Sequence, residues 1–178
     1  MESDHYIYSE DSSLLGSAMD TLSYGDSFLE IGYGGGGNLK HLVHKFNLVV
    51  GTDLNRNGLK SRNEGIDFVI ADRASCFRAN SFDAIAFNPP YLPSAEIIDR
   101  TIDGGVDGIE VPLEFLSSAL QVIKPKGKIL MLISDLGAKE KFENYCKANH
   151  LKFLEFAKRR LFFETLFVYE ICKESLSD

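Results

Sequence analysis

This sequence has no long apolar run, few cysteines and no excess of basic residues. No apolar run approaches the roughly 20 residues that a membrane-spanning helix needs. The first residues, MESDHYIYSEDSS, are acidic and polar rather than signal-like. The cysteines, Cys76, Cys146 and Cys172, are far apart and have no histidines at metal-ligand spacing, which argues against a disulfide framework or a zinc site. We therefore expect a soluble, cytoplasmic protein with reduced thiols and no bound metal.

Acidic residues outnumber basic ones in this 178-residue chain, which gives it a formal net charge of −7. Nucleic-acid-binding proteins usually present a basic face, since neutralisation of phosphates dominates their affinity. The one dense basic cluster, Lys158, Arg159 and Arg160, is of a kind that usually lies on a solvated surface. This charge balance counts against a nucleic-acid substrate. The lack of a long apolar run leads us to expect no membrane partner either.

The sequence does contain a regular alternation of short β-type runs and helical stretches. The apolar content of 44% and the length fit one globular domain, so we expect residues 1–178 to form a single α/β domain. The predicted strands are 27–32, 47–54, 66–72, 81–88 and 126–134. The predicted helices are 11–22, 38–45, a short one through Leu59 and Lys60, 113–123 with Pro112 in its first turn, and 138–149.

The alternation predicts a parallel sheet with helices on both faces, five of its strands being in βα units. Residues 150–172 differ, because two strand-like runs follow each other without a helix and so require an antiparallel hairpin. This seven-stranded, mostly parallel α/β arrangement resembles the Rossmann-like fold of class I S-adenosylmethionine-dependent methyltransferases, in which the last strand inserts antiparallel into the sheet.

A glycine-rich loop, LEIGYGGGGN, follows the first predicted strand. Glycines there permit positive φ and a close approach of the backbone to a ligand. The loop alone also fits a dinucleotide-binding fingerprint, through Gly32, Gly34 and Gly37, or a purely structural turn. Asp53 and Asp72, which close the next two strands, favour an adenosine-shaped slot, since a dinucleotide enzyme has no special use for Asp72.

These residues match the methyltransferase pattern one by one. Glu30, Gly32 and Gly34 resemble its E-x-G-x-G loop, with Tyr33 bulkier than the small residue often found there. Asp53 resembles the acid that binds the ribose. Asp72 and the backbone of Arg73 resemble the contact with the adenine edge. The resemblance therefore implies S-adenosylmethionine as the cofactor.

The fourth strand ends in NPPY, residues 88–91. A residue before proline is extended, so Asn88 points out of the carboxyl end of the strand, and the prolines stiffen the backbone after it. The Asn88 side-chain oxygen and the Pro89 carbonyl then form two acceptors that suit a planar –C–NH₂ group, and Tyr91 offers an aromatic face. This arrangement predicts methyl transfer to an amide or exocyclic amine by positioning, without a dedicated base. The alternative is a double-proline turn in which Asn88 only caps and Tyr91 only packs.

NPPY resembles the signature of HemK-like release-factor glutamine methyltransferases and of adenine methyltransferases. Two further segments favour the first family. YIYSEDSSLL resembles the start of its compact eukaryotic and archaeal members, matching at Tyr6, Glu10, Asp11 and Ser12. In that family the residue at Ser12 lies near the cofactor, although by sequence alone Ser12 could simply cap a helix. DGGVDGIEV, residues 103–111, resembles the family's glycine lid, and Glu110 suits a helix start.

The resemblance implies methylation of the glutamine amide in the Gly-Gly-Gln loop of a class-1 translation release factor. It also implies a small zinc-binding activator protein, which we expect along the second and third strands. The alternatives are an adenine-amine methyltransferase acting on RNA or DNA, for which the chain offers little room and no basic rim, a protein lysine methyltransferase, and a cofactor-binding scaffold without activity.

Overall fold

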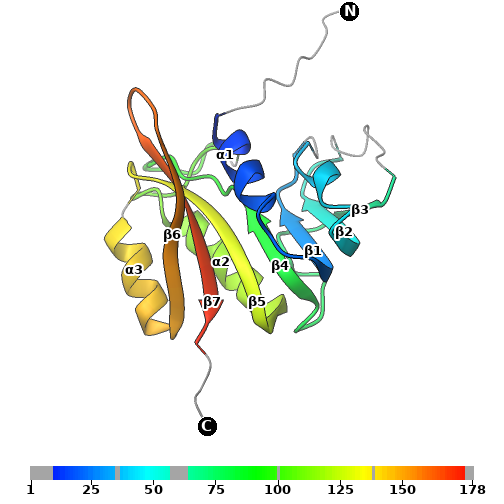
Figure 1. Ribbon diagram of the computed structural model, residues 1–178. Helices are drawn as coiled ribbons and strands as arrows, with labels where there is room; N and C mark the ends of the chain where they lie inside the picture. The colour runs from blue at the N-terminus through cyan, green and yellow to red at the C-terminus, as the bar shows by residue number, and fades with distance from the viewer. Residues whose placement is uncertain (1–9, 35–36, 57–63, 100, 138, 175–178) are drawn as a thin grey trace, which may run out of the picture.

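The computed structural model describes residues 10–34, 37–56, 64–99, 101–137 and 139–174 (Figure 1). Three features of the sequence lie outside these residues. They are the segment around Tyr6, the glycines Gly35 and Gly36, and the short helix predicted through Leu59 and Lys60.

Seven strands in the described residues form one sheet with the order β3-β2-β1-β4-β5-β7-β6 (Figure 1). All neighbouring strands are parallel except β7, which runs antiparallel to both β5 and β6. The predicted α/β fold with an antiparallel strand from the C-terminal hairpin is therefore confirmed. The strands are β1 (Gly25–Ile31), β2 (Phe46–Asp53), β3 (Ile66–Ile70), β4 (Phe82–Phe87), β5 (Ile123–Ser134), β6 (Leu151–Arg160) and β7 (Thr165–Lys173).

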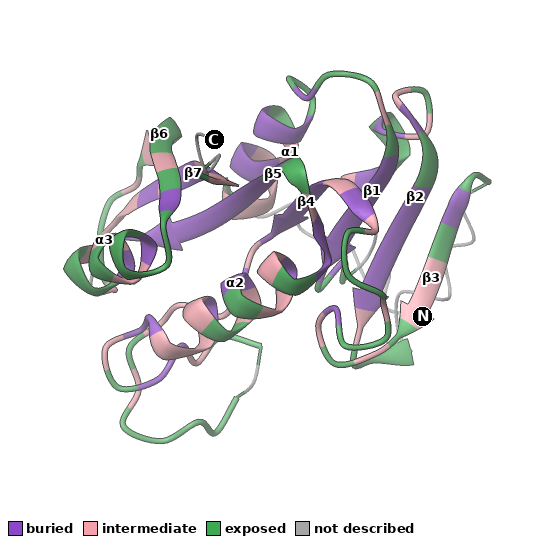
Figure 2. Ribbon diagram, turned by 90° about the horizontal axis from the view of Figure 1, so that it is seen from below, coloured by how far each residue is buried: buried purple, intermediate pink, exposed green. Residues whose placement is uncertain are grey.

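Helices cover both faces of this sheet, as the alternation predicts. α1 (Glu10–Met19) lies on one face, and α2 (Glu110–Val122) and α3 (Lys139–Ala148) lie on the other (Figures 1 and 2). Each helix buries one apolar stripe, because side chains three or four positions apart share a face. Their buried residues are Leu14, Leu15, Ala18 and Met19 in α1, Pro112, Leu116, Ala119 and Val122 in α2, and Phe142 and Cys146 in α3.

The helix predicted over 38–45 is wrong: this segment forms only a 3₁₀ turn, η1 (Leu39–His41). Its backbone bonds span three residues, as from Leu42 N–H to the Leu39 carbonyl at 3.0 Å. Asn38 does not cap the turn, and its side chain instead bonds to Glu30. An uncapped segment of this length gains too few bonds to offset the cost of α-helix nucleation.

The prediction that five strands lie in βα units is also wrong for β3. Residues 71–81, which connect β3 to β4, form turns and no helix. Arg73 and Asn80 have φ values of 51° and 58°, which an α-helix cannot accommodate. α2, by contrast, starts three residues earlier than predicted, with Pro112 in its first turn as expected.

The strand register places three predicted site residues at one level. Ile31 of β1 pairs with Thr52 of β2 on one side and with Phe87 of β4 on the other. The next residues along these strands, Gly32, Asp53 and Asn88, therefore meet at the carboxyl edge of the sheet. In open α/β sheets this edge is where ligands bind.

The strands in the middle of the sheet are largely buried, whereas β3 and β6 form its two edges (Figure 2). The edge strand β3 is buried only at Ile66, and its last residue, Ile70, is 46% exposed. Within the described residues, none of the helices has the length and apolar character needed to cross a membrane.

Candidate active site

The glycine loop after β1 adopts backbone conformations that only glycine accepts readily. Gly32 and Gly34 have φ values of +76° and +53°. The Gly32 N–H donates to the Thr52 carbonyl at 2.7 Å, which holds the loop against the end of β2. The predicted turn is thus ordered at both glycines and faces the carboxyl edge.

Tyr33, between these glycines, points away from the edge into the core. It is 4% exposed, and its ring packs against that of Phe68, with centroids 4.5 Å apart and an interplanar angle of 42°. A Cβ on Gly51 would lie 2.8 Å from the Tyr33 ring, so Gly51 provides the room for it. The Tyr33 side chain, which is bulkier than the residue usual in the methyltransferase loop, therefore packs in the core.

Glu30, the residue before the last of β1, carries a buried carboxyl group. Burial raises its pKa from the ordinary 4.5 to about 8, and the hydrogen bond with Asn38 opposes that shift. Its Oε2 atom has no partner among the described residues. A buried polar atom without a partner costs free energy, so this oxygen marks a place where a polar ligand group would be favoured.

Asp53 reaches back to the glycine loop, where its Oδ2 accepts from the Gly34 N–H at 3.1 Å. Its Oδ1 accepts from the Asn55 N–H at 2.8 Å, which fixes the carboxylate orientation. Two segments 19 residues apart thus hold one half-buried acid beside the loop.

Asp72 lies two residues beyond β3 and pairs with Arg73 at 3.1 Å. The Arg73 guanidinium also reaches Glu114 and lies 5.4 Å above the Phe115 ring, so its side chain turns toward α2. With a φ of 51°, Arg73 is one of few residues other than glycine in the left-handed region, a strain that often accompanies function.

Asn88, the first residue after β4, has its two side-chain polar atoms in different situations. Its Nδ2 donates to Oδ2 of Asp11 at 2.7 Å, whereas its Oδ1 is buried and has no partner in the described part of the chain. The carbonyl of Pro89 likewise receives no hydrogen bond from any described residue. Both acceptors of the NPPY segment thus have no hydrogen-bond partner among the described residues, and their role in binding an amide stays a prediction.

Tyr91 is half-buried beside these acceptors. Burial raises the pKa of its phenol, and the nearby charges of Asp11 and Glu164 raise it further. The phenol consequently stays neutral at physiological pH, which suits an aromatic wall better than a base.

The glycines of the predicted lid pack directly on the NPPY segment. A Cβ on Gly104 would lie 2.7 Å from the Tyr91 Cα, and one on Gly108 would lie 2.4 Å from the Tyr91 carbonyl oxygen. The Gly104 N–H donates to the Leu92 carbonyl at 2.8 Å. Glu110 begins α2, as expected, and accepts from the Asp107 N–H at 3.2 Å. The lid thus fixes the backbone of Tyr91.

Residues 29–89, from β1 through Pro89, match the family model of a methyltransferase domain. The chain is also 30% identical over 133 residues to a putative protein N5-glutamine methyltransferase of Methanocaldococcus jannaschii, and the match covers 67% of each protein. The chain belongs to the protein N5-glutamine methyltransferase family.

Two further relatives place the chain within this family. A release factor glutamine methyltransferase of Bradyrhizobium diazoefficiens is 34% identical over 124 residues, which cover 57% of this chain and 41% of that enzyme. The chain therefore spans less than half of the length of this relative. In the solved Mtq2–Trm112 complex of E. cuniculi, which methylates the eRF1 translation termination factor, the matching chain has a TM-score of 0.79 and 26% identity, with 93% and 96% coverage.

Ser12 is the predicted cofactor-site residue at the N-terminal end of α1. It lies in the first turn of α1 as the structure describes that helix, from Glu10 onward. Its N–H donates to Oδ1 of Asp11 at 2.9 Å. This places Ser12 next to the residue that contacts Asn88, and its contact with the cofactor stays a prediction.

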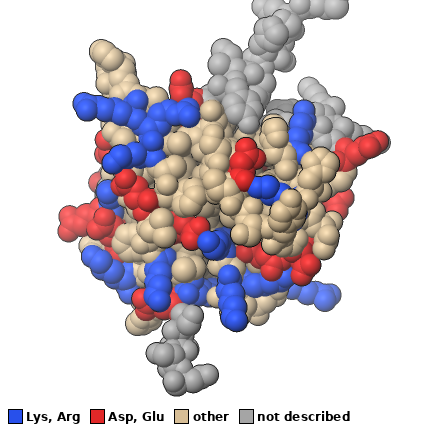
Figure 3. Space-filling model, in the orientation of Figure 1, with Lys and Arg blue, Asp and Glu red and all other residues tan. Residues whose placement is uncertain are grey.

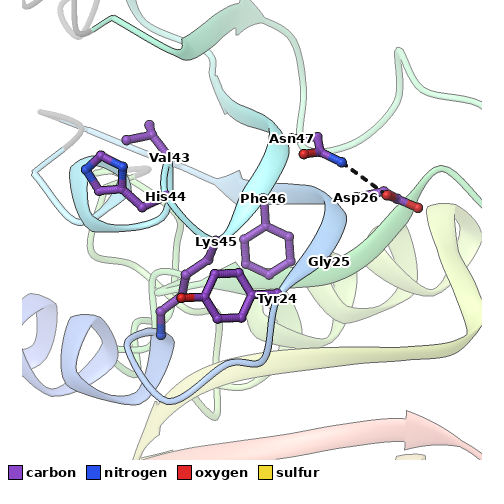
Figure 4. Close-up of a pocket in the computed structure, with 8 residues that line it drawn as sticks. All are labelled: Tyr24, Gly25, Asp26, Val43, His44, Lys45, Phe46 and Asn47. Atoms are coloured by element: carbon purple, nitrogen blue, oxygen red, sulfur yellow. Dashed lines mark hydrogen bonds between the residues drawn. The ribbon is translucent and has the colours of Figure 1, made fainter.

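A surface hollow of about 410 Å³ lies at the opposite edge of the sheet (Figure 4). It is formed by Tyr24, Gly25, Asp26, Val43, His44, Lys45, Phe46 and Asn47, at the amino ends of β1 and β2. None of the residues predicted for the methyltransferase site lines it. It is remote from the carboxyl edge at which this fold binds ligands.

One contact of this candidate site does not follow from the sequence, namely the hydrogen bond between Asn88 and Asp11. Asp11 appears in the sequence only as part of the E-D-S match to the family. Nothing local links a helix residue to a strand end 77 positions later. The two residues come together only when α1 packs on the sheet.

Proposed function

We propose that this chain transfers a methyl group from S-adenosylmethionine to the side-chain amide nitrogen of glutamine in the Gly-Gly-Gln loop of a class-1 translation release factor. The observation that carries this proposal is the pair of acceptors, Asn88 Oδ1 and the Pro89 carbonyl, beside the glycine loop. The names of the relatives support it. A translation factor as substrate favours a cytoplasmic location, and we propose a single methyltransferase domain over residues 1–178, whose seven strands form one sheet.

The residues at the carboxyl edge fit the proposed cofactor. Gly32 and Gly34 bring backbone close to the edge, and Asp53 offers a fixed carboxylate for ribose hydroxyls. Asp72 and the backbone of Arg73 stand further along the edge, where an adenine would be held. The buried Oε2 atom of Glu30, which has no partner in the described part of the chain, suits a cationic or hydrogen-donating group. When bound, S-adenosylmethionine supplies an electrophilic methyl group.

The two acceptors account for the choice of a nitrogen that is otherwise a poor nucleophile. An amide –NH₂ has two N–H groups, which Asn88 Oδ1 and the Pro89 carbonyl can accept together. Holding both orients the nitrogen and stabilises the positive charge that develops on it during transfer. Tyr91 supports the plane of the amide from the side.

The side chains around the edge favour a protein substrate over a nucleic acid. Several large apolar residues of the loops at this edge are exposed: Ile97, Ile98, Ile102, Val106, Leu136, Phe162 and Phe163. We call these residues the apolar rim. Lys and Arg side chains gather near the tip of the β6–β7 hairpin, and charges of both signs are scattered over the rest of that face (Figure 3). We propose a protein partner because exposed apolar side chains of this number usually mark a protein-binding surface.

A second surface, the edge at β3, suits the proposed small activator protein. No described strand pairs with the outer side of β3, which leaves backbone groups free for strand addition. Exposed Leu48, Leu54 and Ile70 add apolar area beside this edge. Trm112 is the partner of the E. cuniculi relative, and we propose a zinc-binding protein of that kind here.

The deciding experiment is incubation of the protein, alone and with such an activator, with labelled S-adenosylmethionine and two acceptors: purified release factor and an oligonucleotide. We expect label on release factor, at the Gly-Gly-Gln glutamine by mass spectrometry. Label only on the oligonucleotide would favour an adenine-amine methyltransferase, and label on lysine would favour protein lysine methylation. Full activity without an activator, and no complex on co-expression, would refute the partner.

A further inference from the structure

We propose that Asp11 is a positioning residue that fixes the Asn88 amide with its oxygen, rather than its nitrogen, toward the substrate. The role of Asn88 as an acceptor rests on the proposed function. The contact that orients it does not, because it lies entirely within this chain.

The chemistry of the contact allows one orientation of the amide. Asn88 Nδ2 lies 2.7 Å from Asp11 Oδ2. A carboxylate accepts hydrogen bonds and donates none, so only the –NH₂ side of the asparagine can face it. The two ends of an amide have nearly the same shape, and rotation by 180° would otherwise present a donor to the substrate. With Nδ2 bound to Asp11, Oδ1 is the end of the amide that has no hydrogen-bond partner among the described residues.

The charge of Asp11 also strengthens the acceptor that it orients. A carboxylate beside the N–H group polarises the amide and draws electron density toward Oδ1. Hydrogen bonds in such chains reinforce each other where water is excluded. Oδ1 then stabilises the positive charge that develops on a methylated nitrogen better than an unpolarised amide would.

Asp11 itself is held from two sides, so its position is set before substrate binds. Its Oδ1 accepts from the Ser12 N–H at 2.9 Å, in the first turn of α1. The adjacent residue, Glu10, is tied to β6 because Arg159 Nη1 donates to its carbonyl at 3.1 Å and to its Oε2 at 2.7 Å. Leu14 and Leu15 bury the same helix against the sheet. A preorganised site requires such support.

The test exploits a second pair of the same chemistry in this chain. Asn47 Nδ2 donates to Asp26 Oδ1 at 3.2 Å at the opposite edge of the sheet (Figure 4). We compare Asp11→Asn with Asp26→Asn, measuring kcat, KM for the acceptor that the wild type labels, cofactor affinity and melting temperature. We expect Asp11→Asn to lower kcat roughly a hundredfold with little change in cofactor affinity. Asp26→Asn should leave all four values unchanged.

A swapped pair separates orientation from a merely structural role. In the double variant Asp11→Asn with Asn88→Asp, the amide at position 11 can donate to one carboxylate oxygen at position 88, and the other oxygen faces the substrate. The net charge is unchanged. We expect this variant to recover at least about tenfold in kcat over Asp11→Asn, which corresponds to about 1.4 kcal/mol.

Two outcomes would overturn the proposal: an Asp11→Asn variant that keeps most of the wild-type kcat, or a folded double variant no faster than the single one. If Asp11→Asn lowers the melting temperature, the double variant still decides, because restored folding without restored kcat counts against orientation. Failure of the proposed function is seen separately, in which acceptor the wild type labels.

Discussion

The side-chain nitrogen of Asn88 lies 2.7 Å from Oδ2 of Asp11, 77 positions earlier in the chain. This contact joins the first turn of α1 to the end of β4 and leaves Asn88 Oδ1 as a buried acceptor without a partner in the described residues. The NPPY segment is therefore one part of a site that a distant helix completes. Single substitutions can separate the contributions of the acceptor, the cofactor slot, the lid and the apolar rim.

Removing the acceptor should stop transfer and spare the cofactor. We expect Asn88→Ala to lower kcat by roughly 10²–10³-fold, because one preorganised contact to developing charge is lost. Cofactor affinity, measured by calorimetry, should stay near the wild-type value. Asn47→Ala, at the opposite edge, is the matched control and should behave as wild type. An Asn88→Ala variant that retains most of its rate would show that the two-acceptor clamp is wrong.

Asp53 should act on cofactor binding first. Asp53→Ala removes a fixed carboxylate and its bond to the Gly34 N–H, so we expect the Kd for S-adenosylmethionine to rise roughly ten- to a hundredfold, the equivalent of one charged hydrogen bond. Asp67→Ala, an exposed acid on β3, is the control. Unchanged affinity in Asp53→Ala, with the protein folded by circular dichroism, would remove Asp53 from the cofactor site.

The buried carboxyl of Glu30 should make the ligand-free protein less stable as pH rises. Burial raises its pKa from 4.5 to about 8, so between these values the folded state holds a proton that the unfolded chain has lost. Stability from this group is complete below about pH 4.5 and disappears as pH rises through about 8. We expect the free energy of unfolding in urea to fall by on the order of 1 kcal/mol per pH unit in this window.

Glu30→Gln supplies the control for that experiment, because glutamine cannot ionise and can keep the bond to Asn38. Its unfolding free energy should lack this component of the decline. If the unfolding free energies of the two proteins depended on pH in the same way, folding would not raise the pKa of Glu30.

Alanine substitutions at Gly108 and Gly65 separate the effect of backbone strain from that of a steric clash with Tyr91. Gly108 and Gly65 have φ values of +65° and +81°, so alanine at either should cost about 1–2 kcal/mol. Only at Gly108 would the new Cβ also meet the Tyr91 carbonyl, at 2.4 Å, whereas at Gly65 the nearest atom is 3.4 Å away. We expect Gly108→Ala to lower kcat and Gly65→Ala to lower only the melting temperature. Equal kcat in the two variants would mean that the lid does not hold Tyr91.

The tip of the β6–β7 hairpin should contribute to substrate binding without contributing to stability. Phe162 and Phe163 are 92% and 85% exposed and pack mainly on each other, with ring centroids 4.6 Å apart. Replacing both by Ser should raise KM for the release factor and leave the melting temperature and cofactor affinity unchanged. Leu154→Ser, exposed on β6, is the control. An unchanged KM would remove the hairpin tip from the apolar rim that contacts substrate.

The sequence by itself determined the order of the strands and the position of the glycine loop after β1. Strand periodicity, the glycines after β1 and the acids after β2 and β3 are local patterns, and the antiparallel hairpin follows from the missing helix before β7. It could not determine the fate of residues 38–45, where the side chain of Asn38 bonds to Glu30 instead of capping a helix.

The tertiary structure alone decided which groups meet at the carboxyl edge. Register brings Gly32, Asp53 and Asn88 to one level, and the packing of α1 brings Asp11 to Asn88. The physical reason is range: propensity and periodicity act over a few residues, whereas a hydrogen bond between distant segments depends on how buried faces pack. The orientation of the Asn88 amide, and with it the acceptor that the proposed chemistry needs, is therefore a property of the folded chain.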